Sequence, residues 1–119
     1  MIKEEKEIPI YRGTLVMILT EDLTELNEEY DVNFTNNYGG GVFNLTDKEG
    51  YTKFFVAFDN DWTYSLIAHE AVHLVNDIFK HKNVKLDVDN DEAQAYFTGW
   101  IFEQCEEFLN KNENGKGDI

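Results

Sequence analysis

The residues best suited to chemistry in this sequence are two histidines and a glutamate, spaced as His69-Glu70-Ala71-Val72-His73. On a helix, residues i and i+4 lie one turn apart on the same face. Two imidazoles so placed can bind one Zn²⁺ with N–Zn distances of about 2.0–2.1 Å. Glu70, about 100° round the helix from His69, can accept a proton from a zinc-bound water. The spacing therefore predicts a zinc site with Glu70 as general base. The alternative is a pair of histidines hydrogen-bonded in the core.

An amphipathic helix must position these side chains. At about 100° per residue, Asp77 joins the two histidines and Glu70 on one polar side. The opposite side is apolar and should face a core; its residues are Ile67, Ala68, Ala71, Val72, Leu74, Val75, Ile78 and Phe79. We predict this helix from Trp62 to Lys80, with an N-cap within Asp59-Asn60-Asp61.

A catalytic zinc site usually has three protein ligands and a water, so two histidines are not sufficient. The remaining histidine, His81, lies near the end of the same predicted helix and cannot reach the same metal. The only cysteine, Cys105, is expected to be a small buried hydrophobe. The third ligand should therefore be a carboxylate.

Glu92 is the best candidate for that carboxylate. It lies in the first turn of a helix predicted from Asn90 to Leu109, after a loop that allows this helix to return and pack against the first. Asp89 and Asp91 are the alternative ligands. Asp89-x-x-Glu92 also fits a capping box with Asp89 as N-cap, in which Glu92 would only serve the end of the helix.

The motif His69-Glu70-x-x-His73, followed by a helical Glu92, resembles the gluzincin branch of the zincin metallopeptidases. The resemblance implies that His69, His73 and Glu92 bind zinc and that Glu70 is the general base for peptide hydrolysis. It also implies that a peptide or protein substrate binds in extended form along an edge strand. The aspartate that braces a histidine in thermolysin-like members is replaced by Tyr96, and Asp77 is the substitute that we expect. In size the chain resembles minimal single-domain zincins, including those that phages encode.

Peptide hydrolysis usually needs a second donor to the oxyanion. Tyr38, Tyr64 and Tyr96 are candidates that the sequence does not rank. The alternative function is a zincin-like interaction module with little or no catalytic activity. The presence of Glu70 favours the enzyme, since zinc binding alone does not need a general base.

Composition excludes several other functions. The 119 residues carry 24 acidic and 10 basic side chains, a formal charge of −14. This charge argues against binding to nucleic acids and to anionic membranes. The sequence shows no signal peptide and no apolar run long enough to span a bilayer, so we expect a cytoplasmic protein. We predict one zincin-like domain over residues 1–109 and a disordered tail over residues 110–119.

The expected fold class is α+β, with a small, mostly antiparallel sheet packed against the two long helices. Strands are predicted over residues 8–19, 42–46 and 51–58, the last two joined by a hairpin turn. Residues 1–7 are strongly charged and are expected to be frayed.

Two further segments connect these strands. Thr20 should cap a short helix that ends at Tyr30. Asp31 to Gly41 is predicted to be a loop, in which the triplet Gly39-Gly40-Gly41 indicates a flexible connection. The alternative for the triplet is close approach of the backbone to a ligand.

Overall fold

Two apolar runs form the centre of the sheet in the computed structural model, which describes residues 1–112. Strands β2 (Thr14–Leu19) and β4 (Thr52–Phe58) are buried along almost their whole length. They pair in parallel, with Leu15 opposite Phe54 and Leu19 opposite Phe58. Apolar residues on both faces of these strands are required because helices cover the sheet on both sides.

The outer strands complete a four-stranded sheet in the order β1-β2-β4-β3. Strand β1 (Ile2–Glu7) is antiparallel to β2, and β3 (Gly40–Thr46) is antiparallel to β4. The predicted α+β class is confirmed, and so is the mostly antiparallel character of the sheet. The parallel pairing at its centre was not predicted.

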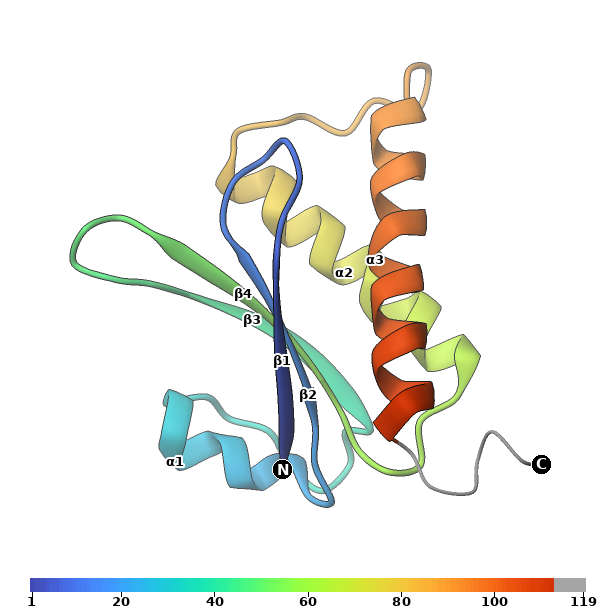
Figure 1. The fold of residues 1–119 in the computed structure, drawn as a ribbon. Coiled ribbons are helices and arrows are strands. Elements are labelled where there is room, and N and C mark those ends of the chain that lie inside the picture. Colours follow the sequence, from blue (N-terminus) through green and yellow to red (C-terminus); the bar gives the residue numbers. More distant parts are fainter. Residues whose placement is uncertain (113–119) are drawn as a thin grey trace.

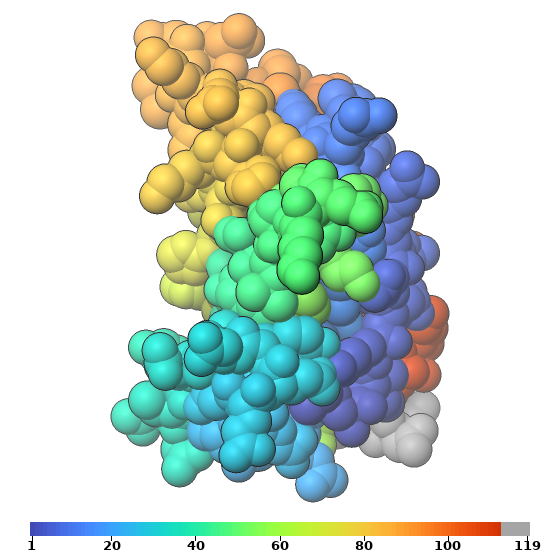
Figure 2. Space-filling view, turned by 90° about the vertical axis from the view of Figure 1, so that its left-hand side faces the viewer, coloured from blue at the N-terminus to red at the C-terminus, as the bar shows by residue number. Residues whose placement is uncertain are grey.

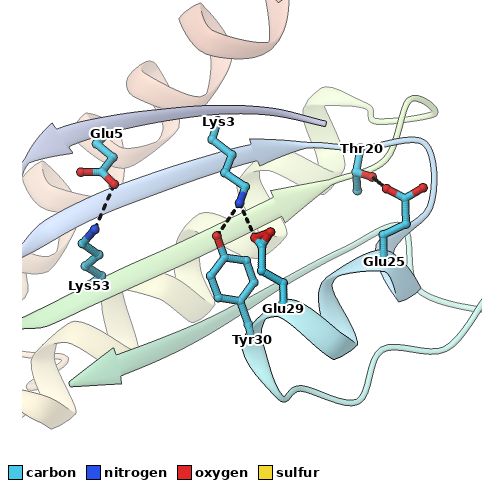
Figure 3. Close-up of polar contacts among 7 residues, drawn as sticks. All are labelled: Lys3, Glu5, Thr20, Glu25, Glu29, Tyr30 and Lys53. Carbon is cyan, nitrogen blue, oxygen red and sulfur yellow. Dashed lines mark hydrogen bonds and ion pairs between the residues drawn. The ribbon is translucent and has the colours of Figure 1, made fainter. Parts of the chain in front are cut away.

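The prediction that residues 1–7 are frayed is wrong, because they form edge strand β1. Its charged side chains find partners on neighbouring elements, as Figure 3 shows. Lys3 Nζ donates to Tyr30 Oη at 2.7 Å and forms an ion pair with Glu29. Lys53 Nζ donates to Glu5 at 3.1 Å. A charged edge strand also resists pairing with other chains.

Strand β2 begins at Thr14, whereas the prediction extended it back to residue 8. The segment from Ile8 to Gly13 is instead the turn between β1 and β2, closed by a bond from Ile8 N to Gly13 O at 3.0 Å. Ile8 is nevertheless buried in the core. Its apolar side chain anchors the turn in the core and does not indicate a strand.

The short helix lies on one face of the sheet and the two long helices on the other (Figure 1). A 3-10 turn (η1, Leu23–Glu25) leads into α1 (Leu26–Tyr30). The N-cap of η1 is Asp22, whose side chain accepts a hydrogen bond from Thr24 N at 2.9 Å; the predicted cap was Thr20.

The long helices are α2 (Tyr64–His81) and α3 (Glu92–Asn112). Thr63 caps α2 by accepting from Leu66 N at 3.1 Å, in place of the predicted Asp59–Asp61 segment. Helix α3 starts two residues later than predicted and includes residues 110–112 of the predicted tail. The rest of that tail lies outside the described residues. None of the described helices is long and apolar enough to cross a membrane.

The apolar side of α2 packs against the sheet and α3 largely as predicted. Six of its residues are buried, namely Ile67, Ala71, Leu74, Val75, Ile78 and Phe79. The other two predicted core positions, Ala68 and Val72, are exposed. The buried sector is therefore narrower than the apolar sector of the sequence, which leaves the histidine side of α2 open to solvent.

Candidate active site

Helix α2 brings the two histidines of the motif together on its exposed side. His69 Nε2 and His73 Nε2 are 3.2 Å apart, and their rings meet at 73°. Two nitrogens that bind one tetrahedral zinc ion lie about 3.3–3.4 Å from each other, given N–Zn distances near 2.05 Å. The separation of the two nitrogens is thus close to that of two ligands of one metal ion. The same distance allows a hydrogen bond between the rings, but both side chains are exposed, so they are not core histidines.

Glu70 lies beside this pair but is buried, with only 5% of the residue exposed. Burial raises the pKa of the Glu70 carboxyl, and the neighbouring His69 and His73 oppose that rise. A carboxylate with a raised pKa is a stronger proton acceptor at neutral pH, which suits a general base.

The absence of a side chain at Gly40 on β3 leaves room for Glu70 where this strand approaches α2. A Cβ added at Gly40 would lie 3.3 Å from Glu70 Cγ and 3.1 Å from Ala57 O. Gly40 and Gly41 are the first two residues of β3, so the prediction that they form a flexible loop is wrong. The alternative interpretation, that the triplet permits close approach, fits better, although the approaching group is the Glu70 side chain.

Strand β3 is the edge strand beside the histidines. Asp59 N donates to Gly39 O at 3.0 Å, which fixes the phase of the antiparallel ladder. Bonded and non-bonded pairs alternate in such a ladder, so the N–H and C=O groups of the half-buried Val42 and Asn44 point outward from the sheet, whereas Gly40 at the start of the strand is buried. They offer hydrogen-bonding groups next to the histidine pair.

The segment between α1 and β3 forms the opposite wall of an open hollow of about 580 Å³. Asn27 holds this wall: its Nδ2 donates to Phe34 O at 2.9 Å and its Oδ1 accepts from Phe34 N at 2.8 Å. The Phe34 ring lies on Gly41, where a Cβ would overlap it. The hollow is lined by Asp31, Val32, Asn33, Phe34, Tyr38, Gly40, Gly41, Val42, Phe43, His69, Glu70 and His73. In Figure 2 this wall (cyan to teal) lies next to the yellow surface of α2.

The structure does not bring Glu92 to the histidine pair. Glu92 is exposed in the first turn of α3 and lines a separate hollow with Tyr96, Gly99 and Trp100. Within residues 1–112, no group of three or more His, Cys, Asp or Glu side chains could hold a metal ion. The alternatives Asp89 and Asp91 are therefore not gathered there either.

The alternative interpretation of Glu92 as part of a capping box is wrong, because Asp89 lies too far from the start of α3 to cap it. Helix α3 begins at Glu92, and Ala95 N donates to Asp91 O at 2.9 Å, which puts Asp91 at the N-cap position. Asp89 N instead donates to Asp87 Oδ1 at 2.9 Å in the preceding turn. Glu92 is thus the first residue of the helix and not the third that a capping box requires.

Asp77 joins α2 to the edge strand. Asn44 Nδ2 on β3 donates to both of its carboxylate oxygens, at 3.0 and 2.9 Å. This contact explains the polar position of Asp77 on α2 without a bond to either histidine.

The three tyrosines that the sequence left unranked lie in different places. Tyr38 lines the hollow with the histidines, whereas Tyr96 lines the hollow of Glu92. Tyr64, at the start of α2, packs edge-on against Trp62 with ring centroids 5.6 Å apart. Tyr38 is therefore the one best placed to reach a substrate.

Sequence reasoning missed Asp31, Phe34 and Asn27, which build the wall of the hollow. The paired glycines were the signal that something packs closely on this strand, but they did not indicate which segment. Comparisons with protein-family models, with curated proteins and with solved structures found no match for this chain.

Proposed function

We propose that this protein is a zinc-dependent peptidase in which His69 and His73 hold the metal and Glu70 is the general base. One observation carries the proposal: the two Nε2 atoms converge to 3.2 Å beside a buried carboxylate. Zinc binding alone would not require Glu70 to be buried at that position, and burial of an ionisable group without a role costs stability.

When bound, zinc would supply a Lewis acid that polarises the substrate carbonyl and lowers the pKa of water. Glu70 takes the proton from the attacking water as the oxygen adds to the scissile carbonyl carbon. The same carboxyl then gives the proton to the leaving amine as the C–N bond breaks. The burial that raises its pKa makes the carboxylate a stronger proton acceptor than an exposed glutamate.

The substrate binds as an additional strand along β3. The outward N–H and C=O groups of Val42 and Asn44 pair with its backbone, so that a peptide bond of the substrate lies in front of the histidines. The Tyr38 hydroxyl, in the same hollow, is the proposed second donor to the oxyanion. Glu92, the third ligand proposed from the sequence, lines a separate hollow, so no third ligand is assigned and Glu92 is tested directly by substitution.

The proposal is tested by metal content and hydrolysis together. Purified protein should contain close to one zinc per chain, and His73→Ala should abolish binding. Glu70→Gln should retain zinc while hydrolysis of a peptide library falls by at least about a hundredfold. Full zinc occupancy in His73→Ala, or unchanged hydrolysis in Glu70→Gln, would exclude this mechanism. Glu92→Gln should weaken zinc binding sharply if Glu92 is the third ligand and leave it unchanged otherwise.

A second function is favoured by one observation, namely that no third ligand lies beside the histidines within residues 1–112. In that case the protein binds peptides along β3 but cleaves them slowly or not at all. Peptide binding that is equal in wild type and Glu70→Gln, without hydrolysis by either, would support this alternative.

A further inference from the structure

We propose that the hollow beside β3 selects a lysine or arginine side chain of the substrate and that Asp31 is the residue that determines this specificity. The inference deepens the proposed function and rests on it, since it names the class of peptide that would bind at the same site.

The lining of the hollow has the composition that a long cationic side chain requires. Val32, Phe34 and Phe43 are half-buried and supply an apolar floor. Asp31 is the only charged residue of the lining apart from the three residues of the motif. In the described part of the chain, no lysine or arginine lines this hollow. Lysine and arginine bury an apolar stem and keep a charged head near water or a carboxylate.

The carboxylate of Asp31 is available to a ligand. The residue is exposed, and no hydrogen bond or ion pair joins its side chain to another residue between positions 1 and 112. Nearby Glu29, by contrast, is already paired with Lys3. An acidic side chain left unpaired at the mouth of a hollow attracts a cation and repels an acidic substrate. The net charge of −14 adds to this preference.

The position of Asp31 is fixed by its surroundings and is not that of a free loop. It adopts the left-handed conformation (φ 54°, ψ 50°) that ends α1. The segment that follows is held by the two hydrogen bonds between Asn27 and the Phe34 backbone. Phe34 is in turn seated on Gly41 of the edge strand. The wall is thus formed before a ligand arrives, which lowers the entropic cost of binding.

The test uses binding, so that it does not depend on hydrolysis. Fluorescently labelled, alanine-based heptapeptides carry one lysine at each internal position in turn, and a matched set carries norleucine, which keeps the apolar stem without the charge. Their affinities for the zinc-loaded Glu70→Gln protein are measured by fluorescence anisotropy. Asp31→Asn is added to this background as the test variant. Glu28→Gln is the matched control, because it removes one exposed carboxylate of α1 that does not line the hollow.

At one position the lysine peptide should bind at least about threefold more tightly than its norleucine counterpart, as for a single exposed ion pair. Asp31→Asn should abolish the difference, Glu28→Gln should retain it, and 0.5 M salt should reduce it. Equal affinities, absence of binding, or a preference that survives Asp31→Asn would overturn the inference. Loss of zinc from Asp31→Asn would also overturn it, because Asp31 would then be a metal ligand. An intact preference, together with zinc-loaded wild type that cleaves none of the peptides, would support the inference and refute the peptidase.

Discussion

Glu70 shows how a single side chain can serve chemistry at the expense of stability. Its ionisable carboxyl is almost fully buried where α2 meets the edge strand β3. Burial raises its pKa above the ordinary value of 4.5 that we expect in the unfolded chain. The carboxyl therefore loses its proton more easily in the unfolded state. Above about pH 4.5, this difference lowers the free energy of unfolding.

This difference in pKa predicts that Glu70→Gln changes the thermal stability of the protein in a pH-dependent way. EDTA is added so that only the metal-free protein is compared. Below about pH 4.5 the carboxyl is protonated in both states and the two proteins should be similarly stable. As the pH rises through the folded pKa, wild type should lose stability relative to the variant, so that Glu70→Gln unfolds at a higher temperature at pH 7. Thermal denaturation at pH 4 and at pH 7 measures this difference, with Glu28→Gln as the control. A variant that is less stable than wild type at pH 7 but equally stable at pH 4 would contradict it.

At the scale of elements, the contact between β3 and α2 controls the site. A Cβ at Gly40 would press on both the Glu70 side chain and the backbone of β4. Gly40→Ala should therefore destabilise the fold by about 1–3 kcal/mol, as overpacking does, and should displace Glu70. Gly99→Ala provides the control, because a Cβ there meets nothing within 4 Å.

Since alanine favours a helix, Gly99→Ala should stabilise α3 by up to about 1 kcal/mol. Urea denaturation of the two variants measures both changes. If Gly40→Ala leaves the midpoint unchanged or raises it, the close approach of β3 to α2 does not restrict position 40.

The elements that the sequence predicted well are those whose pattern is local. Helix α2 follows from its 3.6-residue periodicity, and the hairpin of β3 and β4 from its turn residues. Strand β1 was missed because Lys3, Glu4, Glu5, Lys6 and Glu7 carry no apolar signal; they pair through an edge and through ion pairs with distant residues.

Only part of the candidate site depends on a local pattern, so only that part could be predicted from the sequence. His69, Glu70 and His73 lie on one helix, so their spacing fixes their geometry. Whether Glu92 meets them depends on how α3 packs against α2, which the sequence between the helices does not specify. The wall around Asp31 could not be predicted either, because it is built by side chains that meet across different elements.

At the scale of the whole molecule, the two long helices and one face of the sheet enclose the larger of two apolar clusters, which contains Cys105. This cysteine is fully buried, and burial raises the pKa of its thiol to about 12. The thiolate that reacts with alkylating reagents is therefore almost absent in the folded protein at pH 8.

Iodoacetamide at pH 8 should modify Cys105 slowly in the native protein and rapidly in guanidinium chloride. Mass spectrometry of timed samples measures the two rates, and their ratio reports how rarely the core opens. A small free-thiol compound gives the intrinsic rate for comparison. Native labelling as fast as that of the unfolded chain would mean that α3 does not cover the core as described.

The parallel pairing of β2 with β4 has a consequence for how the chain reaches its native state. The β1–β2 and β3–β4 pairs are both formed by neighbours in sequence and can assemble early and separately. Joining them requires Leu15 to meet Phe54 across the intervening α1 and β3, a contact of high sequence separation that closes slowly. Because the hollow lies between α2 and β3, and the α1 segment forms its wall, we expect the site to be completed only in this late step of folding.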